Sequence, residues 1–322
     1  MRAFIFPGQG SQAVGMGKDF YDHFPAAKAV FDEVDEALPP LYGKKLSQII
    51  FEGPEEVLTE TLYTQAALMT TSLAMCSTLE AELGEPLRAY ASFMAGHSLG
   101  EYSALVTAGV LTLKDAATLL YFRGKSMTEC APKDGGAMAA IMGLESDIVS
   151  EITQAAGCYV ANDNGGMQVV ISGTKDAVAK AMNLATEKGA KRALSLSVSA
   201  PFHCPLMQGA ADVMEEKVAA VPFQNACIPI VTNVQAAAVN QAETFQKDLI
   251  AQVCGQVRWR ESILFLEKKG VTDIMEIGSG KVLTNLVKRI SPSIQATSLS
   301  KIDDLENILV LLSESKKPSS PC

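Results

Sequence analysis

The sequence predicts an α/β protein with a parallel sheet and a smaller subdomain inserted into it. Strand-like and helix-like segments alternate along most of the 322 residues, which is the pattern of α/β folds. One block has the order strand, helix, strand, strand, helix, strand, and this is the order of a ferredoxin-like unit. We therefore expect a large subdomain at residues 1–134 and 199–312, a ferredoxin-like subdomain at 135–198 and a flexible tail at 313–322.

Hydrophobic periodicity sets the expected elements before the insertion. In chain order they are a strand at 1–7, a helix at 66–79, a strand at 92–95, a helix at 101–108 and a helix at 114–127. The segment Thr112-Leu113-Lys114-Asp115 resembles a capping box, which marks the start of the last helix. The pair Gly135-Gly136 then breaks the helical pattern.

The inserted block and the segment after it follow the same logic. The block is expected to hold strands at 137–142, 158–162, 168–172 and 192–198, with helices at 145–156 and 175–188. A helix at 207–221 and strands at 228–232 and 272–277 come next. The glycine-containing loop 278–280 then leads into a last helix.

Composition narrows the class of protein. The net charge of −9 argues against binding to nucleic acid. No apolar run is long enough to span a membrane, and the apolar start of the chain is too short for a signal peptide. Seven cysteines occur without Cys-x-x-Cys spacing, which indicates reduced thiols and no zinc site. We expect a cytoplasmic monomer that needs no metal or other cofactor.

The stretch Gly96-His97-Ser98-Leu99-Gly100 is the strongest functional signal. It lies between a strand-like run and a helix-like run, which is the context of a nucleophile elbow. Glycine on either side permits the sharp turn and the close packing of strand and helix. The serine is then presented beside a helix N-terminus, where N–H groups can stabilise an oxyanion.

A serine nucleophile needs a general base, and the chain has three histidines. His23 lies at a polar helix end and reads as a surface residue. His97 adjoins the nucleophile on the turn and is expected to pack beneath it. His203, in the proline-flanked loop 201–205, is the base by elimination, with a buried structural histidine as the alternative. No Asp or Glu is marked as a third triad member.

Five ordered blocks together resemble one known family. They are Phe6-Pro7-Gly8-Gln9-Gly10-Ser11-Gln12, residues 96–105, Arg123-Gly124-Lys125, Ala200-Pro201-Phe202-His203 and Gly278-Ser279-Gly280-Lys281. This set resembles the malonyl-CoA:acyl carrier protein transacylases, and the similarity extends from about residue 3 to residue 300. The resemblance implies an α/β-hydrolase-like large subdomain around the inserted ferredoxin-like one. The C-terminal tail is not covered.

The resemblance also implies the catalytic roles. Ser98 matches the serine that is acylated, and His203 matches its base. Gln252 falls where the family uses a carbonyl to orient the histidine. Gln9 and the backbone N–H of Leu99 match the oxyanion hole.

Substrate binding is implied at four further positions. Arg123 matches the arginine that grips the malonyl carboxylate, for which a guanidinium offers a planar bidentate partner. Phe202 matches a position that helps to exclude methylmalonate, and Gln65 and Asn164 match further substrate-binding residues. The chain departs from the family beside these positions. Ala66 and Ser279 replace prolines, and residues 162–166 (Asn-Asp-Asn-Gly-Gly) replace the commoner Asn-x-Asn-Ser-Pro.

The implied reaction is transfer of a malonyl group from malonyl-CoA to acyl carrier protein in fatty acid biosynthesis. Carrier proteins are acidic, so docking needs a local basic patch. Lys188, Lys191 and Arg192 match the docking region of the family. A second basic cluster lies at Lys281, Lys288 and Arg289.

Three alternatives stay open at the level of sequence. A trans-acting acyltransferase of a polyketide synthase would carry the same motifs. A serine hydrolase or thioesterase on the same fold would share the elbow but has no need of Arg123. A non-enzymatic carrier-protein scaffold would not need Ser98, His203 and Gln9 together.

Overall fold

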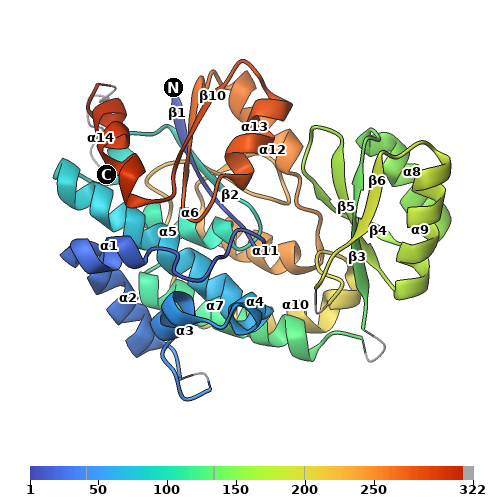
Figure 1. Cartoon of the computed structure of the whole chain (residues 1–322), viewed down its shortest axis with the longest axis horizontal. Helices are drawn as coiled ribbons and strands as arrows, with labels where there is room; N and C mark the ends of the chain where they lie inside the picture. The colour runs from blue at the N-terminus through green and yellow to red at the C-terminus, as the bar shows by residue number, and fades with distance from the viewer. Residues whose placement is uncertain (41, 133–134, 199, 315–322) are drawn as a thin grey trace.

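A computed structural model describes residues 1–40, 42–132, 135–198 and 200–314. Its centre is a six-stranded sheet in the order β10-β9-β1-β2-β7-β8 (Figure 1). The strands are β1 (Arg2–Phe6), β2 (Phe93–Gly96), β7 (Ile230–Val231), β8 (Ala238–Val239), β9 (Asp273–Ile277) and β10 (Gln295–Leu299). All neighbours are parallel except β7 and β8, which pair antiparallel at one edge.

The central strand β1 is buried along its whole length, as expected for a parallel strand covered on both faces. Phe4 and Phe6 belong to the core on one face, whereas Ala3 and Ile5 belong to the core on the other. Alternate side chains of a strand point to opposite faces. One short apolar run therefore joins two cores.

Helices cover both faces of this sheet. Those of the large subdomain are α1 (Lys18–His23), α2 (Pro25–Ala37), α3 (Leu46–Glu52), α4 (Glu55–Thr59), α5 (Thr61–Leu83), α6 (Gly100–Thr107), α7 (Leu113–Glu129), α10 (Gln208–Ala219), α11 (Ala242–Cys254), α12 (Trp259–Lys268), α13 (Val282–Ile290) and α14 (Leu305–Ser313). The long helix α5 is buried along most of its length. It packs against α2 and α7, while α12 and α13 supply the core on the opposite face.

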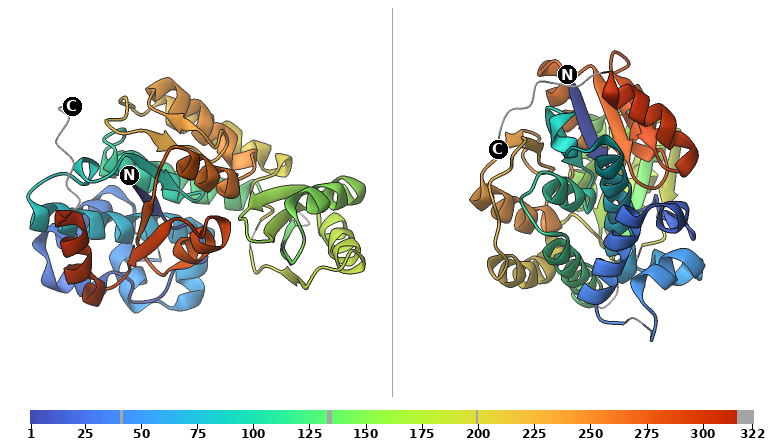
Figure 2. Two further views of the ribbon diagram at one scale, coloured as in Figure 1. Left: turned by 90° about the horizontal axis from the view of Figure 1, so that it is seen from above. Right: turned by 90° about the vertical axis from the view of Figure 1, so that its left-hand side faces the viewer.

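The inserted block forms a separate lobe (Figure 2). It consists of β3 (Ala137–Met142), α8 (Ser146–Ala156), β4 (Tyr159–Asp163), β5 (Gln168–Gly173), α9 (Lys175–Glu187) and β6 (Arg192–Ser195). Its sheet has the order β4-β5-β3-β6 with antiparallel neighbours. The predicted ferredoxin-like order is confirmed. The last strand is shorter than expected, because β6 ends at Ser195.

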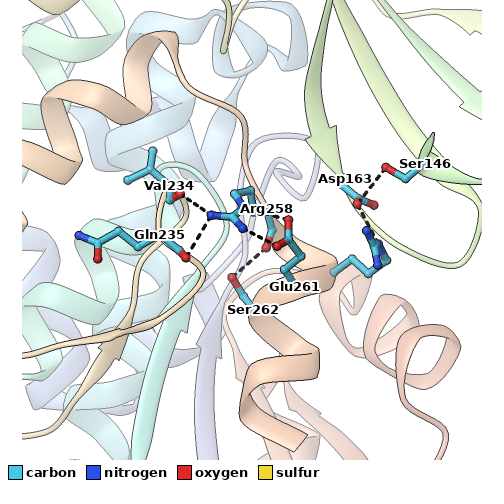
Figure 3. A network of polar contacts seen from close by, with 8 residues as sticks. Ser146, Asp163, Val234, Gln235, Arg258, Glu261 and Ser262 are labelled. Carbon is cyan, nitrogen blue, oxygen red and sulfur yellow. Dashed lines mark hydrogen bonds and ion pairs between the residues drawn. The ribbon is translucent and has the colours of Figure 1, made fainter. Parts of the chain in front are cut away.

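The two lobes meet where β4 ends. The main chain of Asn162 forms a parallel bridge with Val257. Beyond it, the carboxylate of Asp163 accepts from Arg260 Nε at 2.8 Å and from Ser146 Oγ at 3.0 Å. Figure 3 shows Asp163 facing Ser146 at this junction. Main-chain pairing and a largely buried carboxylate thus tie β4 to α12.

Two features differ from the sequence-based expectations or extend beyond them. The antiparallel strand β8, the edge strand β10 and helices α11, α12 and α14 carry no strong sequence marker and were not expected. Ser313, the first residue of the expected tail, ends α14, and residues 315–322 lie outside the described part of the chain. No helix of the described ranges is long and apolar enough to cross a membrane.

Candidate active site

The nucleophile elbow is a sharp turn between β2 and α6, with Ser98 at its tip. Ser98 has a φ of 53°, in the left-handed region that residues other than glycine rarely adopt. A Cβ on Gly96 would lie 1.9 Å from the backbone carbon of Gly100. A Cβ on Gly100 would lie 2.3 Å from the carbonyl oxygen of Phe6. Both flanking positions therefore require glycine for steric reasons.

His203 lies against the elbow as the sequence predicts. Its Nε2 is 2.8 Å from Ser98 Oγ. Its Nδ1 is 2.9 Å from the main-chain oxygen of Gln252 and 3.2 Å from that of Gly255. Two carbonyl acceptors fix Nδ1 as the protonated nitrogen, so Nε2 is free to accept a proton from Ser98. Burial and the nearby Arg123 lower the pKa of His203 to about 3, so the ring is neutral at neutral pH.

The other two histidines occupy different environments. His23 is exposed at the end of α1, as expected. His97 contacts Asn164 Oδ1 through Nε2 at 2.9 Å and stacks obliquely on Trp259, with ring centroids 5.5 Å apart. Burial lowers the pKa of His97. His97 therefore links the elbow to the segment after β4 and is not placed to act on Ser98.

Arg123 of α7 is the charged group of the site, and only 1% of its surface is exposed. Its Nη1 donates to Gln65 Oε1. Its Nη2 donates to Gln252 Oε1 at 2.9 Å and to Ser98 Oγ at 3.2 Å. Within the described ranges no carboxylate forms a salt bridge with it. A buried guanidinium held only by neutral acceptors favours an anionic ligand.

These groups open into one cavity of about 320 Å³. Eight of the positions predicted for catalysis or substrate binding line it: Gln9, Gln65, Ser98, Leu99, Arg123, Asn164, Phe202 and His203. Gln252 lies behind the cavity wall and is fully buried. Ser279, one of the departures from the family pattern, donates to the main-chain oxygen of Ser11 at 2.6 Å. It thereby ties its loop to the loop that carries Gln9.

Sequence reasoning missed the wall that the small lobe contributes. Its members are mostly apolar and come from β3, β5 and the segment after β6: Met138, Val170, Leu196, Ser197 and Val198, together with Asn162. Ordinary strand residues carry no functional signature, so only the fold reveals them.

A second residue missed from the sequence is Asn233, which follows β7. Its Oδ1 accepts from the backbone N–H of Ser98 at 2.7 Å, and its Nδ2 donates to the carbonyl of Gly96 at 2.6 Å. Asn233 is 1% exposed. This amide therefore holds both sides of the turn and helps to keep Ser98 in its strained backbone conformation.

The predicted docking residues lie apart from the cavity. Lys188 and Lys191 are exposed between α9 and β6, and Arg192 is exposed as the first residue of β6. The second basic cluster, Lys281, Lys288 and Arg289, is exposed on α13 and at its N-terminal end. No described group of His, Cys, Asp and Glu residues is arranged to hold a metal ion.

The α/β-hydrolase-like core, with a serine–histidine pair at a nucleophile elbow, places the chain in the class of acyl-transferring enzymes. The model of the acyl transferase domain matches residues 3–300. The malonyl CoA-acyl carrier protein transacylase of Bacillus subtilis strain 168 is 43% identical over 97% of both chains, and that of Escherichia coli K12 is 41% identical over 93% of this chain and 96% of its own. This chain belongs to that family of acyltransferases, and the predicted resemblance is confirmed.

Solved structures give the same result. The acyl-carrier-protein S-malonyltransferase of Bartonella henselae is 46% identical, with a TM-score of 0.92 over 97% of this chain and 99% of its own. A malonyl-transacylase in complex with a type II PKS acyl-carrier protein is 39% identical, with a TM-score of 0.90 over 96% of this chain and 99% of its own. The predicted fold class is confirmed.

Proposed function

We propose that this chain transfers a malonyl group from malonyl-CoA to the phosphopantetheine thiol of acyl carrier protein, in fatty acid biosynthesis. The observation that carries this proposal is Arg123, buried in the same cavity as Ser98 and 3.2 Å from its hydroxyl. A malonyl ester on Ser98 would place a free carboxylate within reach of the guanidinium. A hydrolase of simple acyl groups has no use for such a buried charge.

The first half-reaction loads Ser98. His203 Nε2 accepts the hydroxyl proton while Ser98 Oγ attacks the thioester carbonyl. Backbone N–H groups at Gln9 and Leu99 stabilise the tetrahedral oxyanion, a contribution of about a hundredfold for each donor in comparable sites. The tetrahedral intermediate collapses as the carbon–sulfur bond breaks, and the proton on His203 passes to the departing CoA thiolate. A malonyl-serine ester remains.

The second half-reaction transfers the group to the carrier. The phosphopantetheine thiol gives its proton to His203 and attacks the ester carbonyl of acylated Ser98. The same oxyanion donors hold the second tetrahedral intermediate. His203 returns the proton to Ser98 Oγ as the ester bond breaks, and the free enzyme is restored.

Three other lining residues would shape the acyl site. Gln65 supports the guanidinium of Arg123 and helps to direct it toward the cavity. Phe202, adjacent to the base, would crowd an α-methyl group and disfavour methylmalonate. Asn164, already paired with His97, would offer its amide to the acyl chain.

The acyl-enzyme provides the direct test. Incubation with malonyl-CoA alone is expected to add one malonyl group to the wild-type protein, measured as intact mass, and none to Ser98→Ala. Addition of acyl carrier protein should then discharge the adduct onto the carrier. A malonyl adduct on Ser98→Ala would contradict the proposal. Rapid hydrolysis of the malonyl-serine ester in the presence of carrier protein, without transfer to the carrier, would also contradict it.

The proposal also covers the carrier-protein partner, the biosynthetic pathway, the cellular location and the oligomeric state. The basic residues Lys188, Lys191 and Arg192 would receive an acidic carrier protein, and we propose a cytoplasmic monomer that binds neither nucleic acid nor membrane. The relative in complex with a type II PKS carrier makes a polyketide carrier the second candidate. Discharge rates with a fatty-acid carrier and a polyketide carrier, measured in parallel, separate the two pathways.

A further inference from the structure

Glu101 lies in the first turn of α6, directly behind the elbow, and the reaction above does not use it. Its side chain is fully buried. Its Oε2 accepts from the main-chain N–H of Asn233 at 2.8 Å and from Gln252 Nε2 at 3.0 Å. Its Oε1 has no hydrogen-bond partner among the described residues. A buried carboxylate is costly unless it is hydrogen-bonded, and the two hydrogen-bond partners of Glu101 both contact the reacting residues.

The first partner, Gln252, leads to the base. The Oε1 atom of Gln252 accepts from Arg123 Nη2, a group that can only donate. The Nε2 atom of Gln252 is therefore the one that donates to Glu101. The same Nε2 also donates to the main-chain oxygen of Ser98 at 3.1 Å. Meanwhile the main-chain oxygen of Gln252 accepts from His203. Glu101 therefore fixes the residue that orients the imidazole.

The second partner, Asn233, leads to the nucleophile. The main-chain N–H of Asn233 donates to Glu101. The side chain of Asn233 bridges the N–H of Ser98 and the carbonyl of Gly96. Both paths from one carboxylate thus end on the reacting pair, each through a single intervening residue.

We propose that Glu101 is a positioning residue that replaces the carboxylate of a Ser-His-Asp triad, acting on His203 through Gln252 and on Ser98 through Asn233. In a triad the carboxylate orients the histidine and stabilises the imidazolium that forms as the serine is deprotonated. Here the orienting contact is a main-chain carbonyl, and the negative charge lies one residue further back. This inference rests on the proposed function, because it assumes acylation of Ser98 with His203 as base.

The charges around Glu101 define when it is ionised. Arg123 faces it from α7, Asp248 from α11 and Tyr102 from its own helix. Burial dominates and raises the pKa of Glu101 to about 8, against the hydrogen bonds from Asn233 and Gln252. The carboxyl therefore gains its charge as the pH rises through about 8. His203, with its lowered pKa, is neutral over that whole range.

The test measures the single-turnover rate of Ser98 acylation between about pH 6 and about pH 9. The wild-type rate is expected to rise as Glu101 ionises. Glu101→Gln keeps the size of the side chain and removes the charge, so its rate should be at least about tenfold lower at the alkaline end and independent of pH. Malonyl-CoA and acetyl-CoA should be affected alike, because Glu101 acts on the reacting pair.

Glu276→Gln is the matched control. Glu276 is also fully buried, but it accepts from the N–H groups of Leu283 and Thr284 at the start of α13. This variant should lower thermal stability and keep the wild-type pH profile of acylation. Equal slowing in both variants would overturn the inference.

The wild-type profile keeps the inference testable if Glu101→Gln fails to fold. A flat wild-type profile would overturn it, and so would a Glu101→Gln variant with wild-type rates. If the wild type forms no malonyl adduct, the proposed function fails and the inference falls with it. Adduct formation with a flat profile removes the inference alone.

Discussion

In the proposed function, Arg123 is the residue that would decide which acyl group Ser98 carries. Ser98 and His203 would serve any acyl transfer, but a guanidinium that is 1% exposed and held by amide oxygens selects for an anion. Burial lowers the pKa of Arg123. An incoming carboxylate that accepts hydrogen bonds directly from the guanidinium would offset this desolvation. Binding energy thus comes from neutralising a charge that folding has already buried.

Replacement of this residue separates specificity from catalysis. Arg123→Ala is expected to reduce kcat/KM for malonyl-CoA by about a hundredfold, because the malonyl carboxylate would be buried without a partner. Acetyl-CoA, which lacks the carboxylate, should be transferred as well as by the wild type or better. Arg123→Lys keeps the charge and loses the planar pair of donors. Its kcat/KM for malonyl-CoA should therefore lie between those of the wild type and Arg123→Ala. Equal loss on both substrates would show that Arg123 only supports Gln252 and the elbow.

Strand β6 lies between the proposed docking residues and the cavity. It is an edge strand, and among the described strands it pairs with β3. Lys191 and Arg192 are exposed at its start, and Leu194 and Leu196 are 47% and 37% exposed further along. Leu196 also lines the cavity that holds Ser98. A basic end followed by an apolar stretch would guide an acidic carrier and its pantetheine arm toward the serine.

Charge reversal tests this surface. Lys191→Glu combined with Arg192→Glu is expected to raise KM for acyl carrier protein about tenfold or more and to leave KM for malonyl-CoA unchanged. The increase should shrink at high salt, since exposed charges are screened. The same reversal at Lys288 and Arg289 on α13 is the matched comparison. A larger increase in KM for acyl carrier protein in that variant would indicate that the carrier docks on α13.

Some elements could be predicted because the residues that determine them are close together in the sequence. Strand β2, the elbow and α6 are encoded by an apolar run, two glycines and a helical repeat that adjoin one another. The small lobe was predicted for the same reason, since its strands and helices alternate with clear turns. Elimination among the three histidines of the chain pointed to His203, and the structure places its Nε2 2.8 Å from Ser98 Oγ.

Other parts depend on contacts that no sequence pattern expresses. The carbonyl that orients His203 belongs to the main chain of Gln252, and every residue has such a group, so only the family resemblance pointed to this position. Glu101 was visible as the residue after Gly100, yet its role follows from Asn233, more than a hundred positions away in the chain. Long-range pairing of buried polar groups is a property of the folded molecule.

The shape of the cavity beside Ser98 depends on how the two lobes are joined. Asp163 is largely buried on the small lobe and pairs with Arg260 of α12 on the large one. Its neighbours Asn162 and Asn164 line the cavity, and Asn164 contacts His97 beside the nucleophile. The ion pair therefore sets the position of one cavity wall relative to Ser98.

Breaking this junction should change substrate binding more than chemistry. Arg260→Ala leaves Asp163 buried with only neutral partners, so we expect KM for malonyl-CoA to rise several-fold while kcat changes little. Arg2→Ala is the matched control, because it removes the Arg2–Asp273 ion pair of 2.6 Å inside the large lobe. That variant should lower the melting temperature without changing KM. An Arg260→Ala enzyme with unchanged KM, or equal KM changes in both variants, would show that the lobes hold their relative position through the β4–Val257 main-chain pairing alone.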